Sequence, residues 1–235
     1  MKISILTLFP NMFTGPFDES IIKRAQNYGL VEIETRQLRD WAHDKHQTVD
    51  DRPYGGGVGM LMKIEPIAEA LKELKVQSSK CKIVLMDAGG EKFTQRKAEE
   101  YSKLDHLILV CGRYEGVDHR VHEHLVDDVI SIGDFVVTGG EIPAMLVVDS
   151  VTRLIPNVLE KDTATDFESF SLSQMEDGKS KMENLLEYPQ YTRPEEFNGW
   201  KVPEVLLTGD HKKIEEWKKE ESIKKTKKVR PDLLK

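Results

Sequence analysis

The chain has little cysteine and no long apolar run. Its two cysteines, Cys81 and Cys111, cannot build a disulfide framework, which favours a reducing compartment. No stretch approaches the roughly 18 apolar residues that a membrane-spanning helix requires. Residues 1–10 contain one lysine and no small-residue cleavage site, so we expect a first strand there and not a signal peptide. These absences predict a soluble, cytoplasmic protein.

Several common catalytic motifs are also missing. The sequence has no G-x-x-x-x-G-K-[ST] motif, and no G-x-G-x-x-G follows a predicted strand, which argues against a P-loop hydrolase and a dinucleotide-binding fold. It has no G-x-S-x-G motif, and neither cysteine has a neighbour arranged to activate it, so covalent catalysis is unsupported. Histidines at positions 43, 46, 119, 122 and 124 have no accompanying CxxC or HExxH motif. We therefore expect no metal site, a solvated helix at 119–124, and loop or substrate contacts at 43–46.

Charge is distributed unevenly along the chain. The formal net charge is −7, from 34 Lys and Arg against 41 Asp and Glu. Residues 211–235 hold ten basic and five acidic residues, a net charge of +5, which leaves −12 for the remainder. A basic end on an acidic body indicates a polyanionic partner, although a solvated amphipathic helix would have the same composition.

Short apolar runs alternate with helical patterns over the first 155 residues. The predicted strands are residues 3–8, 31–36, 82–86, 107–111 and 129–131. The predicted helices are residues 20–28, 65–75, 94–103 and 141–155. Strands separated by helices of this length predict an α/β fold with a mainly parallel sheet.

The composition changes after Pro156. Residues 160–187 are polar and acidic, which predicts a flexible linker that is either a passive tether or a lid that orders on binding. Beyond it, Ile214, Trp217 and Ile223 form a modest apolar stripe in a small helical domain. The expected organisation is a domain at 1–159, a linker or lid at 160–187 and a helical domain at 188–235.

Glycine is concentrated in three loops, at residues 53–60, 112–116 and 132–140. Two of them follow predicted strands. Loops at the carboxyl ends of parallel strands are where open α/β folds bind ligands, and glycine lets the backbone approach a ligand closely. The pattern predicts a ligand site at this edge of the sheet.

One polar pair interrupts the apolar helix predicted at 141–155. Asp149 and Arg153 are four residues apart and share a face, as in an ordinary ion pair. Alternatively, an arginine at the end of this helix can stabilise a developing anion. Just beyond it, Asp162, Asp166 and Glu168 are either solvated linker acids or a source of a general base.

Taken together, these segments resemble the TrmD family of bacterial tRNA (guanine-N1)-methyltransferases, in the SPOUT superfamily. The resemblance rests on TLFPxMF at 7–13, HxTVDDRPYGGGVGM at 46–60, LVCGRYEGVD at 109–118, SIGDFVVTGGEIPAM at 131–145 and YTRP at 191–194. These segments span nearly the whole chain in the family's order.

The resemblance implies a fold and an assembly that periodicity cannot give. The fold would be α/β, a SPOUT-type parallel sheet with a deep trefoil knot, plus a small helical C-terminal domain that binds tRNA. Unknotted topology is the general expectation, so the knot comes from the family alone. The resemblance also implies an obligate homodimer with active sites at the subunit interface.

The implied reaction is methyl transfer from S-adenosyl-L-methionine to N1 of the guanine at position 37 of tRNA, next to the anticodon. The residues implied to bind the methyl donor are Leu85, Met86, Asp87, Ala88, Gly89, Gly90, Gly112, Tyr114, Glu115, Ile132, Gly133, Asp134, Phe135, Val136, Val137, Gly139, Gly140 and Pro143. Those implied to lie on the substrate side are His46, Asp50, Arg52, Tyr54, Gly55 and Gly57. Asp87 and Ala88 depart mildly from the family pattern.

The resemblance gives Arg153 the role of contacting guanine O6. The family's catalytic aspartate precedes Ser-Phe, so Ser169-Phe170 places Glu168 at that position, with Asp166 as the alternative base. A glutamate carboxylate reaches about 1.5 Å farther than an aspartate carboxylate. The glutamate alone favours a second interpretation, a non-catalytic dimeric RNA-binding protein that retains the fold. Assistance by a divalent ion cannot be inferred from the sequence.

Overall fold

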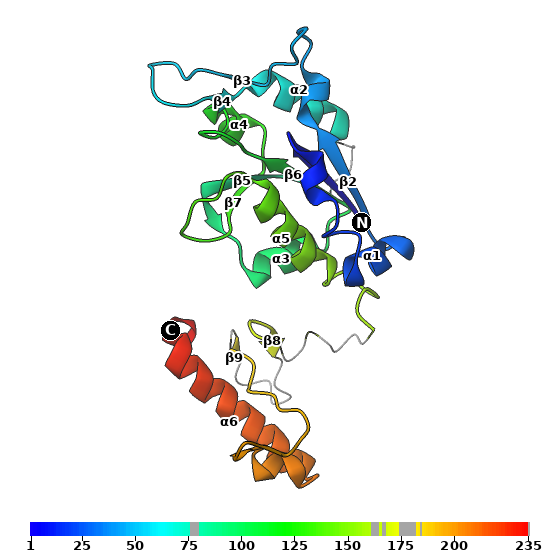
Figure 1. Cartoon of the computed structure of the whole chain (residues 1–235), viewed down its shortest axis with the longest axis vertical. Coiled ribbons are helices and arrows are strands. Elements are labelled where there is room, and N and C mark those ends of the chain that lie inside the picture. The colour runs from blue at the N-terminus through cyan, green and yellow to red at the C-terminus, as the bar shows by residue number, and fades with distance from the viewer. Residues whose placement is uncertain (76–79, 161–164, 166–167, 174–181, 184, 235) are drawn as a thin grey trace. The chain divides into compact units, whose positions relative to one another are not determined.

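The computed structural model describes residues 1–75, 80–160, 165, 168–173, 182–183 and 185–234. The chain divides into two compact units, Met1–Glu160 and Lys161–Lys235 (Figure 1).

A five-stranded sheet in the order β2-β1-β6-β5-β7 organises the first unit. Its strands are β1 (Lys2–Thr7), β2 (Glu32–Gln37), β5 (Cys81–Lys92), β6 (His106–Cys111) and β7 (Asp128–Ser131). Every pairing in this sheet is parallel, which confirms the predicted α/β class. All residues of β6 are buried, as expected for a central strand that is covered on both faces.

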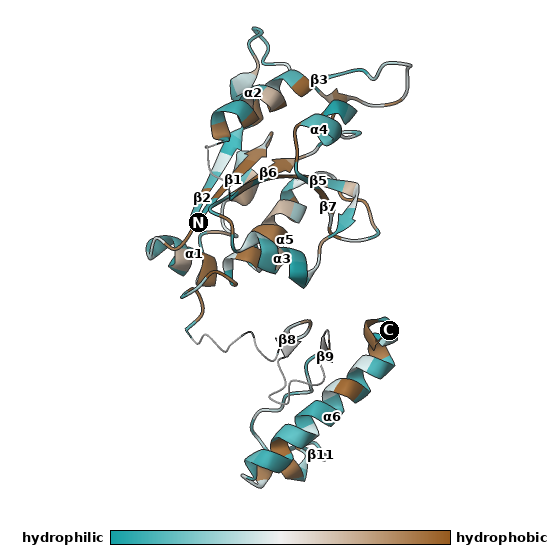
Figure 2. Cartoon of the chain, turned by 180° about the vertical axis from the view of Figure 1, so that it is seen from behind, coloured by the Kyte–Doolittle hydropathy of each residue, from teal (hydrophilic) through white to brown (hydrophobic). Residues whose placement is uncertain are grey.

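Helices cover both faces of the sheet (Figure 1). They are α1 (Ser20–Asn27), α3 (Gln95–Tyr101) and α5 (Glu141–Thr152) on one face, and α2 (Ile64–Leu74) and α4 (His119–His124) on the other. Alternate residues of β6 enter opposite cores: Leu107 and Leu109 pack towards α5, and Ile108 and Val110 towards α2. Figure 2 shows this hydrophobic character concentrated on the central strands.

Strand β5 is longer than predicted because it continues through a bulge. Its pairing with β7 shifts between Met86 and Glu91, so the residues between them leave the regular ladder. At Gly90 a Cβ would lie 2.5 Å from the carbonyl carbon of Val129, which no side chain can tolerate. The bulge carries residues 87–90 to the carboxyl edge of the sheet.

Helix α5 ends at Thr152, three residues before the predicted end. Ile155 precedes Pro156, and the residue before a proline disfavours the helical conformation. The last turn tightens instead, with the N–H groups of Leu154 and Ile155 donating to the carbonyls of Val151 and Thr152. Arg153 therefore caps the helix.

The remaining elements of the first unit are short. They are η1 (Pro10–Phe13), η2 (Leu38–Trp41) and the antiparallel pair β3 (Asp50–Asp51) and β4 (Leu61–Met62). The pair β3-β4 brackets the glycine-rich loop at 53–60.

The second unit contains the long helix α6 (His211–Val229), whose first turn is capped by Asp210. A hairpin of β10 (Glu196–Phe197) and β11 (Trp200–Lys201) turns at Asn198-Gly199, where both residues have the positive φ that this turn requires. The other elements are β8 (Leu172–Ser173) paired with β9 (Met182–Glu183), η4 (Glu204–Leu207) and η5 (Pro231–Leu234). Much of the linker predicted at 160–187 lies outside the described residues. None of the described helices combines the length and apolar character needed to cross a bilayer.

Candidate active site

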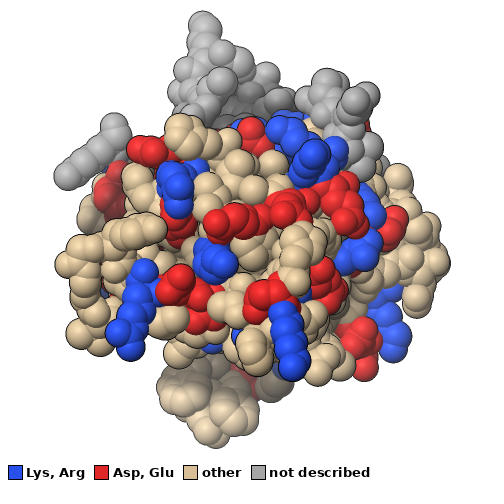
Figure 3. All heavy atoms as spheres, turned by 90° about the horizontal axis from the view of Figure 1, so that it is seen from above, with Lys and Arg blue, Asp and Glu red and all other residues tan. Residues whose placement is uncertain are grey.

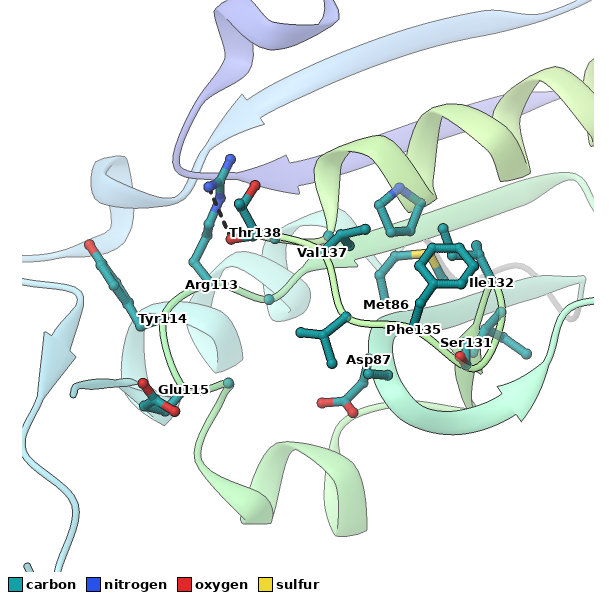
Figure 4. Close-up of a pocket in the computed structure, with 18 residues that line it drawn as sticks. Met86, Asp87, Arg113, Tyr114, Glu115, Ser131, Ile132, Phe135, Val137 and Thr138 are labelled. Atoms are coloured by element: carbon teal, nitrogen blue, oxygen red, sulfur yellow. Dashed lines mark hydrogen bonds between the residues drawn. The ribbon is translucent and has the colours of Figure 1, made fainter. Parts of the chain in front are cut away.

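A cavity of about 240 Å³ opens at the carboxyl ends of β5, β6 and β7 (Figure 4). Three chain segments line it: the β5 bulge, the loop after β6, and the loop between β7 and α5. The lining residues are Met86, Asp87, Ala88, Gly112, Arg113, Tyr114, Glu115, Gly116, Ile130, Ser131, Ile132, Phe135, Val136, Val137, Thr138, Gly139, Gly140 and Pro143. Two predicted glycine loops therefore meet at one site.

Close backbone contact joins the last two of these segments. The N–H of Gly140 donates to the carbonyl of Gly112 at 2.8 Å. A Cβ at Gly140 would lie 2.7 Å from Cα of Cys111, so the approach requires glycine. The chain thus returns from the edge strand β7 to the end of β6 before it enters α5.

The third glycine-rich loop borders the pocket without lining it. The N–H of Glu115 donates to the carbonyl of Met60, and the N–H of Met62 donates to that of Gly116, both at 3.0 Å. Gly59 has φ +86°, and a Cβ there would lie 2.4 Å from Cγ of Glu115. This packing places Glu115 between the pocket and the loop at 53–60.

A buried ion pair holds the pocket wall. Nε of Arg113 lies 2.8 Å from Oε2 of Glu141, which is fully buried at the start of α5. The other Glu141 oxygen accepts a 2.8 Å hydrogen bond from the hydroxyl of Thr7 at the end of β1. Arg113 also donates to the carbonyl of Thr138 and lies over the ring of Phe9, 4.5 Å from its centroid. This network connects the ends of β1 and β6 with the loop before α5.

A second polar contact reaches the pocket from α4. Nε2 of His122 lies 3.3 Å from Oδ2 of Asp87, and Oδ1 of Asp87 accepts a 2.7 Å hydrogen bond from the N–H of Gly89. The ring of His122 stacks on that of the exposed His119. The prediction of a solvated helix at 119–124 therefore holds for His119 and His124 but not for His122, which is turned towards Asp87.

The cysteines remain unsuited to nucleophilic chemistry. Cys111 lies at the end of β6, and burial raises the pKa of its thiol well above the ordinary value. Burial likewise raises the pKa of Cys81. Since a thiolate is the nucleophilic form, neither cysteine is activated. The described residues contain no group of three or more side chains placed to hold a metal ion.

Most of the residues expected to bind the methyl donor line the pocket. The expected residues that do not are Leu85, Gly89, Gly90, Gly133 and Asp134. Leu85 points into the core beneath α2, and the exposed Asp134 pairs with Lys92 at 3.3 Å. The lining residues that the expectation missed are Arg113, Gly116, Ile130, Ser131 and Thr138, all within two residues of an expected position in the sequence.

The residues expected on the substrate side do not line the pocket. His46, Arg52, Tyr54, Gly55 and Gly57 are exposed, and Asp50 is half-buried in β3. The ring of Tyr54 is fully exposed, with no packing that would explain an aromatic residue there. The segment is available to a large ligand.

The expected catalytic residues fall in different units. Arg153 caps α5 in the first unit, where its N–H donates to the carbonyl of Asp149. Glu168 belongs to the second unit, and Asp166 lies outside the described residues.

The segment that carries Glu168 is connected to α6. The N–H of Phe170 donates to the carbonyl of Leu185, and the N–H of Glu187 donates to Oγ of Ser169, both at 3.0 Å. Between these two, the N–H of Leu186 donates at 2.9 Å to Oγ1 of Thr226, a fully buried residue of α6. These bonds attach the segment to the helix that bears the basic residues.

Comparison with known proteins agrees with the family resemblance over the whole length of the chain. The family model described as tRNA (Guanine-1)-methyltransferase TrmD matches residues 1–235. The chain is 53% identical over 234 residues to a protein of Dictyoglomus turgidum and 52% identical over 234 residues to one of Geobacter sp. strain M21, covering 100% of this chain and 90% of each relative. It is 52% identical over 235 residues to a protein of Anoxybacillus flavithermus, covering 100% of this chain and 91% of that relative. Each relative is named tRNA (guanine-N(1)-)-methyltransferase.

Proposed function

The chain belongs to the TrmD family of tRNA (guanine-1)-methyltransferases, and from that premise we propose that it methylates N1 of the guanine at position 37 of tRNA with S-adenosylmethionine as donor. The observation that carries the proposal is the pocket at the carboxyl ends of β5, β6 and β7, built from the strand-end glycine loops. The non-catalytic alternative has only the glutamate at position 168 in its favour.

The pocket's residues fit S-adenosylmethionine. Ile130, Ile132 and Phe135 supply apolar walls suited to a flat base, and the glycine backbones leave room for close approach. The carboxylates of Asp87 and Glu115 suit a ligand with cationic groups. When bound, the donor supplies an electrophilic methyl group on a sulfonium.

The protein's task is to make guanine N1 nucleophilic. N1 carries a proton at neutral pH, so a base must remove it before its electron pair can attack the methyl carbon. Glu168 takes this proton, while negative charge shifts to O6. As the N1–C bond forms, the C–S bond breaks and sulfur keeps the electron pair. A positioned base contributes about 10²–10⁴-fold to the rate.

Arg153 stabilises the charge that develops on O6. A donor placed at such an oxygen contributes about 10²–10³-fold. The guanidinium is permanently charged and presents several N–H groups, which suits it to this role. Its position at the end of α5 fixes its backbone on the same helix that begins at Glu141 beside the pocket.

The proposal includes the family's knot and homodimer. In favour of a SPOUT-type knot, the loop after β7 passes back against Gly112 before α5 packs on the sheet. In favour of a dimer, apolar side chains lie exposed around the pocket and on the outer face of α5. These are Phe9, Phe135, Val136, Ile142 and Leu146. Pairing two subunits through this face would cover them and complete each site.

The second unit is the proposed tRNA-binding part. Its helix α6 carries Lys224, Lys227 and Lys228, which line a surface hollow together with Glu220 and Ile223. By contrast, the face of the first unit seen in Figure 3 has acidic and basic side chains interspersed. A cluster of lysines favours phosphates and makes binding sensitive to salt. Action on tRNA places the protein in the cytoplasm.

Transfer of a radiolabelled methyl group tests the function. We expect purified protein with labelled donor to label a tRNA that has guanine at position 37, and digestion to yield 1-methylguanosine. The same tRNA with adenine at position 37 should remain unlabelled. Binding of tRNA without any labelling would support the non-catalytic alternative instead.

A further inference from the structure

The carboxylate of Asp87 is fixed on the pocket wall by two donors. Oδ1 accepts a hydrogen bond from the N–H of Gly89 within the β5 bulge, and Oδ2 contacts His122 from α4. The two side chains are only 29% and 21% exposed. Figure 4 shows Asp87 beneath Phe135 and Val137 at the edge of the pocket. A carboxylate held at both oxygens keeps its charge in one place, unlike a freely rotating surface acid.

This charge is not balanced within the pocket. The charged residues of the lining are Asp87, Glu115 and Arg113. The charge of Arg113 is already offset by the buried Glu141. His122 contacts Asp87 from outside the lining. The pocket therefore presents an excess of negative charge to a bound ligand.

The two ligands of the proposed reaction differ in charge at one atom. S-adenosylmethionine has a positively charged sulfonium, whereas its demethylated product, S-adenosylhomocysteine, has a neutral thioether in the same place. A fixed charge in a partly buried pocket acts on a unit charge over several ångströms. The charge of Asp87 therefore acts on the sulfonium of the donor and not on the neutral thioether of the product.

We propose that Asp87, positioned by His122, makes the pocket prefer the cationic methyl donor over its neutral product. The inference rests on the proposed function and deepens it. A pocket that binds the donor more tightly than the product is less inhibited by that product. It also gives a role to His122, the one histidine of α4 that is turned away from solvent. Asp87 acts on the ligand, and His122 acts through Asp87.

Calorimetric titration of the full-length protein with each ligand tests the role of Asp87. In Asp87→Asn, we expect the Kd for the donor to rise about tenfold and that for the product to change less than about twofold. Asparagine keeps the shape and the hydrogen bond from Gly89, so product affinity serves as the check on folding. Asp18→Asn, which removes an exposed acid outside the lining, should change neither. An equal change for both ligands, or no change for either, would overturn the proposal.

A second set of variants tests the role of His122. His122→Leu should lower the ratio of donor to product affinity, and His122→Gln, which retains a donor, should restore much of it. The double variant Asp87→Asn/His122→Leu should show the same ratio as Asp87→Asn alone, because His122 works through Asp87. Additive effects would contradict that role. His124→Gln, at the exposed end of α4, is the matched control.

The outcomes separate this inference from the proposed function. If the wild-type protein binds neither ligand and labels no tRNA, the proposed function fails. If it labels tRNA but Asp87→Asn keeps the wild-type preference for the donor, only the discrimination by Asp87 is refuted.

Discussion

The two parts of the proposed active site are held in different ways. The proposed donor pocket lies on the parallel sheet, where the buried Arg113–Glu141 pair and the Gly140–Gly112 hydrogen bond join its loops. The segment that carries Glu168 is attached to α6 by a few hydrogen bonds, one of them to Thr226. The first arrangement is built within the first unit, whereas the segment of Glu168 belongs to the proposed RNA-binding unit. Donor binding and delivery of the base should therefore respond to different substitutions.

The strongest test of this separation is Glu168→Ala. Without the base, we expect the single-turnover rate of methyl transfer to fall about 10²–10⁴-fold. The Kd for the donor should stay unchanged because the pocket belongs to the other unit. Glu187→Ala, a change of a nearby carboxylate in the second unit, should leave the rate near that of the wild type. If Asp166→Ala abolishes transfer and Glu168→Ala does not, the base is Asp166 and the function stands.

Arg153→Ala should produce the next largest effect. We expect the rate to fall about 10²–10³-fold, since charge on O6 is no longer stabilised. Arg153→Lys should recover only part of the loss, because an ammonium lacks the planar set of donors. Rates measured with saturating donor and tRNA isolate the chemical step. A loss confined to tRNA affinity would instead show that Arg153 only binds the substrate.

The buried pair in the pocket wall gives a contrasting prediction for the first unit. In Glu141→Gln, the charge of Arg113 loses its counter-charge, and breaking such a buried pair costs about 3–5 kcal/mol. Urea denaturation should show a lower free energy of unfolding, and calorimetry a weaker donor affinity. Glu91→Gln removes the charge of an exposed residue of β5 that pairs with Lys97. It should change the free energy of unfolding and the donor affinity far less. Unaltered donor affinity would mean that the pair does not position the wall.

Thr226→Val tests the attachment of the base in the second unit. Valine has the shape of threonine but leaves the buried N–H of Leu186 without an acceptor, which costs about 1–3 kcal/mol. We expect the transfer rate to fall about tenfold while donor affinity is retained. Thr208→Val removes a hydroxyl from an exposed turn of the same unit and is the matched control. Weakened donor binding would show that the two units do not act separately.

The sequence predicted the repetitive parts of this structure better than its junctions. The apolar runs of β1, β6 and β7 are visible in the sequence to within about one residue, and for the central strands β1 and β6 this is because they are buried on both faces. The bulge at Gly90 depends on the backbone of β7, about 40 residues away, which no local pattern can reveal. The pairing of Arg113 with Glu141 and of Asp87 with His122 likewise depends on how distant loops meet. The resemblance to the family named most of the residues that line the pocket, whereas only the structure shows these contacts.

The smallest expected effect concerns the opposite end of the sheet. His106 begins β6, is 4% exposed and has Nε2 2.9 Å from Oγ of Ser4. Burial lowers the pKa of His106, and the charge of Lys2 lowers it further. The unfolded chain, with an ordinary histidine pKa of about 6.5, then binds the proton more readily than the folded one.

The free energy of unfolding should therefore fall as the pH drops below about 6.5, because protons favour the unfolded state. The slope from one such group is at most about 1.4 kcal/mol per pH unit. Urea denaturation between pH 5 and 7 should show this slope in the wild type and a shallower one in His106→Asn, which cannot titrate. His119→Gln, at an exposed position on α4, should keep the wild-type slope. His106 lies at the amino ends of the strands, whereas the pocket lies at their carboxyl ends. The pH dependence of donor affinity should therefore be the same in His106→Asn as in the wild type. If His106→Asn reduced the pH dependence of both the free energy of unfolding and the donor affinity, the pocket and the opposite end of the sheet would be one cooperative element.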